Sequence, residues 1–193
     1  AKAPVRLIHY GYAEDPETMA RKHQRRLDMI RQWVASEPDN YIARAYLSHT
    51  LLENADTLRE AADEGIKALK QAQEQKAPAV NYPRIYYPLL TALAALGRED
   101  EVLEHAQECE RITPTYPDAP FYTAWAHYIR HRWSEVCAAS RRFLELQEKS
   151  RQNPEEFVYF ENLTFNRINS ALVRWVIAAS YLGQEDEALR LLE

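Results

Sequence analysis

The sequence predicts an all-α protein built as a solenoid of stacked helix-turn-helix units. Residues 96–103 (LGREDEVL) return almost unchanged as residues 182–189 (LGQEDEAL), 86 positions later. In both copies a Leu-Gly pair closes an apolar stretch and acidic residues follow, which suits the C-terminus of one helix and the positive N-terminus of the next. Only four glycines are present, and the alternation of β-branched residues expected of strands is nearly absent after residue 10.

The register of the units is set by a spacing of 34 residues. Val136 follows Val102 at that distance, and Phe143 follows Cys109 in the same way. A recurring helix-turn-helix of this length resembles the tetratricopeptide repeat (TPR), and the resemblance implies a right-handed superhelix. The expected repeat array covers residues 39–193, with units at about 39–75, 83–116, 117–150 and 165–193, and the longer connections between units are expected to project from its edge.

The segment in front of the array has a different pattern. Residues 5–10 (VRLIHY) predict a short strand, so that residues 1–16 form a strand and loop, and residues 17–38 form a linker or capping helix. A lone strand is not stable, so we expect residues 1–16 to be the edge of a larger domain that precedes the array. Leu27, Ile30 and Val34 recur at helical spacing, so the helix could also cap the first repeat with its apolar face.

The junction resembles that of bacterial family 2 glycosyltransferases, in which a GT-A domain that binds a nucleotide sugar leads through a helix into TPR units. The residues that carry this resemblance are His9, Tyr10, Gly11 and Tyr12, then Lys22, Arg25, Arg26 and Leu27, then Pro38, Asp39 and Asn40. The chain departs from the family at Arg26, where asparagine is usual. The family's nucleotide-binding strands, its D-x-D metal motif and its acidic catalytic region are not found in this sequence.

The resemblance implies a divalent metal and a nucleotide sugar for the parent enzyme, with His9 as a metal ligand beside the missing catalytic domain. A neutral imidazole can complete the coordination of such an ion. The alternative is a histidine at a strand end with no ligand, because a metal needs further ligands. We expect no catalytic residue and no cofactor in this segment itself.

Composition restricts the possible partners. Lys and Arg number 24 against 29 Asp and Glu, a net charge of −5, and no basic stripe suggests nucleic-acid binding. No apolar run approaches the roughly 20 residues that span a bilayer. Cys109 and Cys137 fall on inward helix positions, which favours buried, reduced thiols and a cytoplasmic location. His127 and His131 lie four apart without a third ligand, so we expect surface groups.

The first helix of each unit is expected to line the binding surface of the array. The candidate groove residues on these helices, which combine aromatic area with two cations, are Arg84, Tyr87, Thr91, Phe121, Tyr122, Trp125, Tyr128, Val173, Arg174 and Ile177. Such a groove suits an extended peptide or a stacked sugar. The alternative is that these aromatic residues simply pack helix against helix. The positions at which chaperone-binding TPR domains hold a peptide carboxylate contain other residue types here.

Two functions remain open from the sequence. The first is a non-catalytic TPR interaction module at the C-terminal end of a glycosyltransferase, presenting a protein acceptor or partner to the catalytic domain. The second is a free-standing adaptor that binds peptides or proteins and has no enzymatic parent. The final helix would expose Leu191 and Leu192, so the chain could also form homo-oligomers through it.

Overall fold

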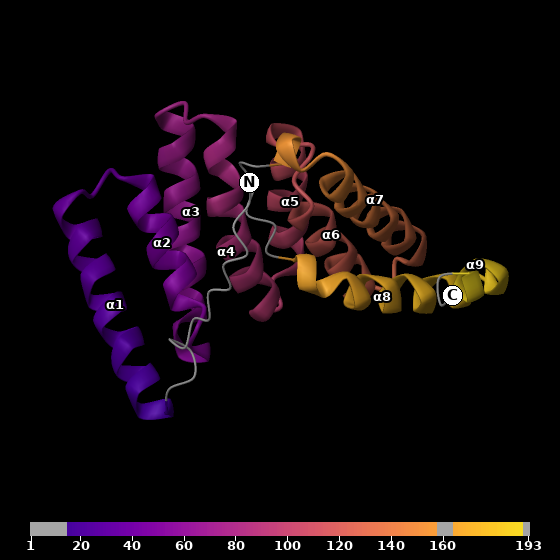
Figure 1. The fold of residues 1–193 in the computed structure, drawn as a ribbon, viewed down its shortest axis with the longest axis horizontal. Helices are drawn as coiled ribbons and strands as arrows, with labels where there is room; N and C mark the ends of the chain where they lie inside the picture. Colours follow the sequence, from indigo (N-terminus) through magenta and orange to yellow (C-terminus); the bar gives the residue numbers. More distant parts are fainter. Residues whose placement is uncertain (1–14, 158–163, 191–193) are drawn as a thin grey trace, which may run out of the picture.

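Helices follow one another along the whole of the part that the computed structural model describes, residues 15–157 and 164–190 (Figure 1). Every regular element within these residues is helical, so the all-α prediction is confirmed. The strand expected at residues 5–10 lies outside the described residues. The α-helices are α1 (Pro16–Ser36), α2 (Tyr41–Leu51), α3 (Leu58–Glu74), α4 (Tyr82–Ala95), α5 (Glu99–Ile112), α6 (Asp118–Ile129), α7 (Trp133–Gln152), α8 (Ile168–Tyr181) and α9 (Glu185–Arg190). Short 3₁₀ turns lie at η1 (Ala55–Thr57), η2 (Ala79–Asn81), η3 (Pro154–Phe157) and η4 (Phe165–Arg167).

The helices form a row in which sequence neighbours are also neighbours in space (Figure 1). Each α-helix packs against the one before it and the one after it. In addition α2 contacts α4, α4 contacts α6, and α6 contacts α8, whereas α3, α5 and α7 pack mainly on the even-numbered helices beside them. The helices α2, α4, α6 and α8 therefore form one continuous layer, which we call the even-helix layer.

Three elbows between paired helices share one backbone geometry. Gly97, His131 and Gly183 each have a positive φ, of 67°, 54° and 69°. In each elbow the next residue donates its N–H to the carbonyl five residues earlier, Arg98 to Leu93 at 3.0 Å, Arg132 to His127 at 3.0 Å and Gln184 to Ala179 at 2.9 Å. This bond pattern closes a helix when one residue adopts the left-handed conformation, which glycine enters without strain.

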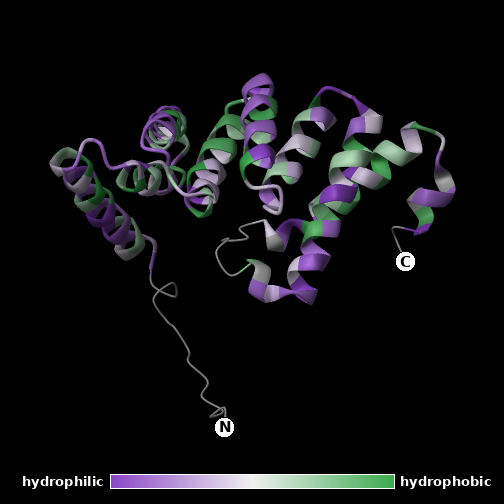
Figure 2. Ribbon diagram, turned by 90° about the horizontal axis from the view of Figure 1, so that it is seen from above, coloured by the Kyte–Doolittle hydropathy of each residue, from purple (hydrophilic) through white to green (hydrophobic). Residues whose placement is uncertain are grey.

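The spacing of 34 residues also positions the core. Val102 in α5 and Val136 in α7 are both fully buried. Cys109 and Phe143, about two helical turns further along the same two helices, are fully buried as well. Apolar residues that face neighbouring helices supply most of the stability of such a stack, because each pair of helices covers the next. Figure 2 shows hydrophobic and hydrophilic residues together along each helix, as this arrangement requires.

The helix α1 packs on α2 through one apolar edge. Asp15 begins the helix by accepting a hydrogen bond from the N–H of Thr18 at 3.0 Å. Leu27 is buried, and Ile30 and Val34 pack against the same core at partial exposure. The apolar spacing read from the sequence thus coincides with the face that α1 turns toward the array.

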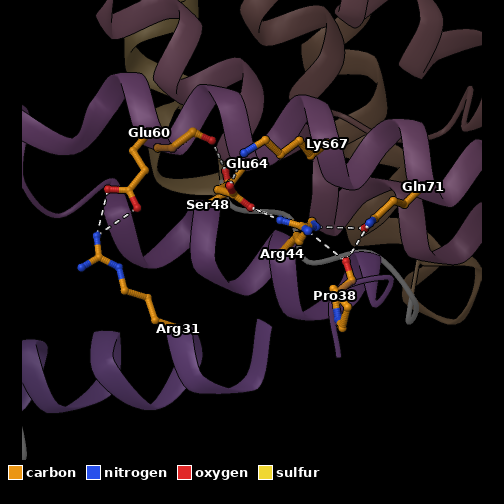
Figure 3. Close-up of polar contacts among 9 residues, drawn as sticks. Arg31, Pro38, Arg44, Ser48, Glu60, Glu64, Lys67 and Gln71 are labelled. Atoms are coloured by element: carbon orange, nitrogen blue, oxygen red, sulfur yellow. Dashed lines mark hydrogen bonds and ion pairs between the residues drawn. The ribbon is translucent and has the colours of Figure 1, made fainter. Parts of the chain in front are cut away.

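A polar network joins the α1–α2 connection to α3 (Figure 3). Arg44 of α2 donates from all three nitrogens: Nη1 to Glu64 at 2.7 Å, Nε to Gln71 at 3.1 Å and Nη2 to the carbonyl of Pro38 at 2.9 Å. Lys67 donates to the other Glu64 oxygen at 2.7 Å. Burial would raise the pKa of Glu64, but the hydrogen bonds from Lys67 and Arg44 outweigh it and hold that pKa below the usual value.

The start of α8 is held against α6 by a buried carboxylate. Asp118, at the first turn of α6, is fully buried and accepts hydrogen bonds from the hydroxyl of Tyr116 at 2.6 Å and from the N–H of Thr164 at 3.1 Å. The hydroxyl of Thr164 donates to the same carboxylate. This anchor fixes η4 and the first turn of α8, so that α8 takes its place in the even-helix layer.

Candidate functional site

The candidate site is the even-helix layer, where the groove residues expected from the sequence come together. Between α2 and α4 the guanidinium of Arg84 lies 5.2 Å from the ring centroid of Tyr46, and its Nη1 donates to that hydroxyl at 3.1 Å. One turn further, the rings of His49 and Tyr87 meet edge to face at 5.6 Å. Aromatic and cationic groups therefore cross this helix interface in two successive turns.

Two hydroxyl groups join α4 to α6. Thr91 donates its hydrogen to the carbonyl of Tyr87 at 2.7 Å, so the hydroxyl of Tyr122 must donate in the contact of 2.6 Å between Thr91 Oγ1 and Tyr122 Oη. Burial raises the pKa of Tyr122 well above its ordinary value, and the phenol stays neutral. This bond fixes the α4–α6 register inside the layer.

Phe121 and Tyr122 belong to the core and do not line an open groove. Their side chains are 3 % and 4 % exposed. The two rings meet edge to face at 5.3 Å, and the ring of Phe121 also lies 5.4 Å from that of Phe143 in α7. The expectation that these two rings offer binding surface is therefore wrong. Tyr122 faces α4 and Phe121 faces α7, and packing against these helices covers both rings.

Arg174 of α8 lies against this core. Its guanidinium carbon is 4.3 Å from the centroid of the Phe121 ring, a cation–π contact. Its Nε and Nη2 atoms are buried from solvent and have no hydrogen-bond partner. Burial, together with the nearby charge of Arg167, lowers the pKa of Arg174 to about 10. Two buried guanidinium nitrogens without an acceptor are costly, because polar groups are rarely buried without a hydrogen bond.

The other expected groove residues differ in exposure. Val173 is 55 % exposed. Arg84 is also exposed and is engaged with Tyr46 as described. Four more side chains from three helices are half-buried and present part of their surface, namely Tyr87, Trp125, Tyr128 and Ile177, and Thr91 is half-buried as well. Tyr128 in addition packs edge to face on Trp133 at 5.9 Å. The layer thus offers a partly apolar surface with the exposed side chain of Arg84 on α4.

Sequence reasoning missed two contributors to this site. One is Tyr46, whose hydroxyl accepts a hydrogen bond from Arg84. Tyr46 lies in the first helix of the first expected unit, so counting along that helix could have found it. Arg167 lies in η4, within the longer connection before α8, and its charge acts on Arg174 and Tyr122. Arg167 lies inside the last expected unit, residues 165–193, but in the 3₁₀ turn before the first helix of that unit, so counting along that helix did not find it.

A separate cavity of 310 Å³ lies between α5, α6 and α7. It is lined by Glu110, Pro120, Thr123, His127, Glu135, Ala138, Ala139 and Arg142. Burial raises the pKa of Glu110 and lowers that of His127, whose Nδ1 is buried without a partner. His127 is therefore not the surface group that its spacing suggested, whereas His131 is exposed in an elbow.

Nothing in the described part of the chain fits the divalent metal that the glycosyltransferase resemblance implies. No group of three or more His, Cys, Asp or Glu side chains among residues 15–157 and 164–190 is arranged to hold a metal ion. His9 lies outside the described residues, so its role stays a prediction. Cys109 and Cys137 are buried, as expected, and burial raises the pKa of both thiols.

No family model matches the sequence, and no curated protein matches it. In the described residues no helix combines the length and the apolar character needed to cross a bilayer.

Proposed function

We propose that this chain is a TPR-like interaction module that binds an extended polypeptide along the even-helix layer. The observation that carries the proposal is the succession of contacts from α2 to α4, α6 and α8, with Arg84, Tyr87 and Val173 accessible on it. Successive first helices of repeat units supply a continuous surface of this kind. The units' TPR character and the right-handed superhelix stay predictions, and the shared elbow geometry supports them.

The chemistry of the layer favours a peptide as ligand. Half-buried aromatic and aliphatic side chains can each accommodate a ligand side chain, and hydroxyl and guanidinium groups can orient its polar atoms. Several helices contribute, so an extended segment can bind across them. Weak contacts at each helix then add up over the length of the layer.

A peptide library displayed on phage and selected against the purified chain tests this function. Selected peptides should lose at least about tenfold in affinity for Val173→Glu, which places a charge on the even-helix layer. The matched control is Gln107→Glu, which adds the same charge at an exposed position of α5. Equal affinity for both variants, or the absence of any selected peptide, would contradict binding at this layer.

We further propose that the module belongs to a family 2-type glycosyltransferase and presents a protein acceptor to its catalytic domain. The support is the resemblance of residues 6–40 to that junction. In the full-length protein, removal of the residues after Tyr12 should leave nucleotide-sugar binding intact and impair use of the acceptor. A full-length protein that binds no nucleotide sugar would favour the free-standing adaptor instead.

Self-association through the last helix is a separate proposal. Leu189 of α9 is 62 % exposed, and Tyr181 and Leu182 just before it are exposed as well. Exposed apolar residues that lie together are typical of contact surfaces. Sedimentation equilibrium of the wild type and of Leu189→Ser tests whether this end of the row mediates a dimer.

A further inference from the structure

One face of α6 carries polar residues where α4 and α8 carry buried apolar ones. In the three elbows, the carbonyls that accept the closing hydrogen bond belong to equivalent residues, namely Leu93, His127 and Ala179. Leu93 and Ala179 are fully buried, whereas His127 is half-buried. One turn earlier, Thr123 of α6 is half-buried where Leu89 of α4 is fully buried. Two core positions of the repeat are therefore polar in α6.

A third polar residue of this kind lies on α5. The spacing of 34 residues makes Glu110 equivalent to Leu144 of α7, just as it relates Cys109 to Phe143. Leu144 packs against the core, whereas Glu110 lines the cavity of 310 Å³ between α5, α6 and α7. The two polar residues of α6 line the same cavity. Polar side chains thus surround this cavity at three positions where equivalent residues pack in the core.

A ligand can enter this cavity from solvent. The cavity is open, and Glu135 and Ala138 on its α7 wall are exposed. Glu110, Thr123 and His127 are only half-buried, so each keeps accessible surface. Its volume lies at the lower end of the range of about 300–1,000 Å³ that is typical of ligand pockets. The cavity therefore suits a small molecule or a single side chain of a larger one.

The polar groups of the cavity accept hydrogen bonds more readily than they donate them. Within the described residues no group donates a hydrogen bond to the Glu110 carboxyl, and Arg142 attracts it without forming an ion pair. The hydroxyl of Thr123 donates its hydrogen to a carbonyl of its own helix at 3.1 Å, so its oxygen can only accept from a ligand. Glu135 is a second carboxylate, whereas Arg142 already donates from Nη2 to the carbonyl of Pro114 at 2.8 Å. A ligand that donates hydrogen bonds fits this lining.

We propose that this cavity binds an alkylammonium ion about as long as a lysine side chain. Its ammonium group donates to the carboxylate of Glu110, and the hydroxyl oxygen of Thr123 offers a further acceptor. Its methylene groups lie against the apolar part of the lining, which consists of Pro120, Ala138 and Ala139. The site is distinct from the surface proposed for polypeptide binding and does not depend on that proposal.

Charge favours a cation over an anion in this cavity. Burial lowers the pKa of His127, so the imidazole is neutral near about pH 7, and the lining then carries two carboxyl groups against one guanidinium. Burial also raises the pKa of Glu110, as expected for a carboxyl without compensating donors. Glu64 shows how such donors act, because Lys67 and Arg44 each donate to it at 2.7 Å and its pKa is lowered despite burial (Figure 3). An ammonium group at Glu110 would supply what Lys67 supplies to Glu64.

Three probes of similar size and different charge test the proposal. They are butylammonium, butanol and butyrate, each added to the wild-type chain at matched ionic strength and pH. The methyl resonances of Ala138 and Ala139 in a ¹H–¹³C spectrum report on the cavity directly, because both residues line it. We expect butylammonium to shift them in a saturable way, with a dissociation constant at least about tenfold below those of the other two probes. A smaller preference, or no saturable shift with butylammonium, overturns the proposal.

Variants of Glu110 separate binding from folding. Glu110→Gln keeps the shape and removes the charge, so the affinity for butylammonium should fall at least about tenfold. Its unfolding temperature should equal that of wild type or exceed it, because the carboxyl has no partner to lose. Glu110→Leu introduces the residue type of the equivalent position in α7, and should unfold at a higher temperature and show no saturable shift. Undiminished binding by Glu110→Gln, or a lower unfolding temperature for it, would overturn the proposal.

The matched control is Glu104→Gln, which removes the same charge at an exposed position of α5. This variant should bind butylammonium as wild type does, and a loss equal to that of Glu110→Gln would overturn the site in favour of a long-range effect of charge. The capped tripeptide acetyl-Gly-Lys-Gly-amide distinguishes the two sources of such an ion. If it displaces butylammonium, the site takes a lysine side chain of a partner protein, and if it does not, the site takes a free amine.

Discussion

Two arginines on the even-helix layer, Arg44 in α2 and Arg174 in α8, occupy comparable half-buried positions and differ in their partners. Arg44 donates from each of its three nitrogens to α3 or to the α1–α2 connection. Arg174 has the ring of Phe121 on one face and two buried nitrogens without an acceptor. The first side chain is held by hydrogen bonds, whereas the second is held by packing on a ring and leaves two donors unsatisfied. The same residue type on the same layer can therefore be stabilised in two different ways.

Of the variants that test this comparison, Arg44→Met is expected to cause the largest loss in free energy of unfolding. It leaves Glu64, whose side chain is 11 % exposed, with Lys67 as its remaining ion-pair partner, and it removes one of two hydrogen bonds to the carbonyl of Pro38, which still accepts from Gln71. Because Lys67 still pairs with Glu64, we expect a loss of about 2 kcal/mol, which is less than the cost of a fully unpaired buried charge. Urea unfolding followed by circular dichroism measures the free energy. A loss below about 0.5 kcal/mol would place Arg44 among ordinary surface pairs.

Replacing both partners, in Arg44→Met/Glu64→Met, sharpens the same measurement. The double variant has no carboxylate that has lost one of its two cationic partners, so most of the lost stability should return. If the double variant is as unstable as Arg44→Met, the hydrogen bonds to Pro38 and Gln71 carry the stability and not the ion pair.

Acid should reveal the ion pair through the pH dependence of stability. The pKa of Glu64 is lower in the folded chain than in the unfolded one, so its contribution is present above about pH 4.5 and is lost as the pH falls through the folded value. The difference in free energy of unfolding between wild type and Arg44→Met should therefore shrink from pH 6 toward pH 3. The corresponding difference for Arg174→Met should stay constant, because the pKa of Arg174 is far above this pH range in both the folded and the unfolded chain. A constant difference for Arg44→Met would contradict the role given to Glu64.

Weakening the contact that holds the start of α8, at the other end of the layer, should cause an intermediate loss of stability. Thr164→Val removes the side-chain donor to the buried Asp118 while keeping the shape, and should cost about 1–2 kcal/mol. Hydrogen exchange of amides in α8 should accelerate more than that of amides in α3. Equal acceleration throughout the chain would indicate a single cooperative unit instead.

The smallest expected effect on stability is that of Arg174→Met. It should change the free energy of unfolding by less than about 0.5 kcal/mol, or raise it, because no hydrogen bond is lost. The same urea titration as for Arg44→Met measures it. A loss comparable to that of Arg44→Met would remove the contrast between the two arginines.

The sequence was sufficient for the helices and their spacing and insufficient for side-chain partners. Helix ends and the positions of Val102 and Val136 follow from local rules, namely glycine at a helix end and apolar periodicity. The pairing of Arg44 with Glu64 joins two helices whose relative rotation is set by tertiary packing. For the same reason periodicity could not tell that Phe121 and Tyr122 would be covered, or that the edge of Arg174 would lack an acceptor.

The matching elbows at Gly97, His131 and Gly183 have a consequence for how this chain could be lengthened or shortened. Because the chain reverses direction in the same way at all three, a segment cut at one elbow should join at another without disturbing the backbone on either side. The stretch from residue 98 to residue 131 is such a cassette. Inserting a second copy should add one helix pair to the row, and the middle elbow, where an imidazole replaces glycine, is the one joint that glycine should relax.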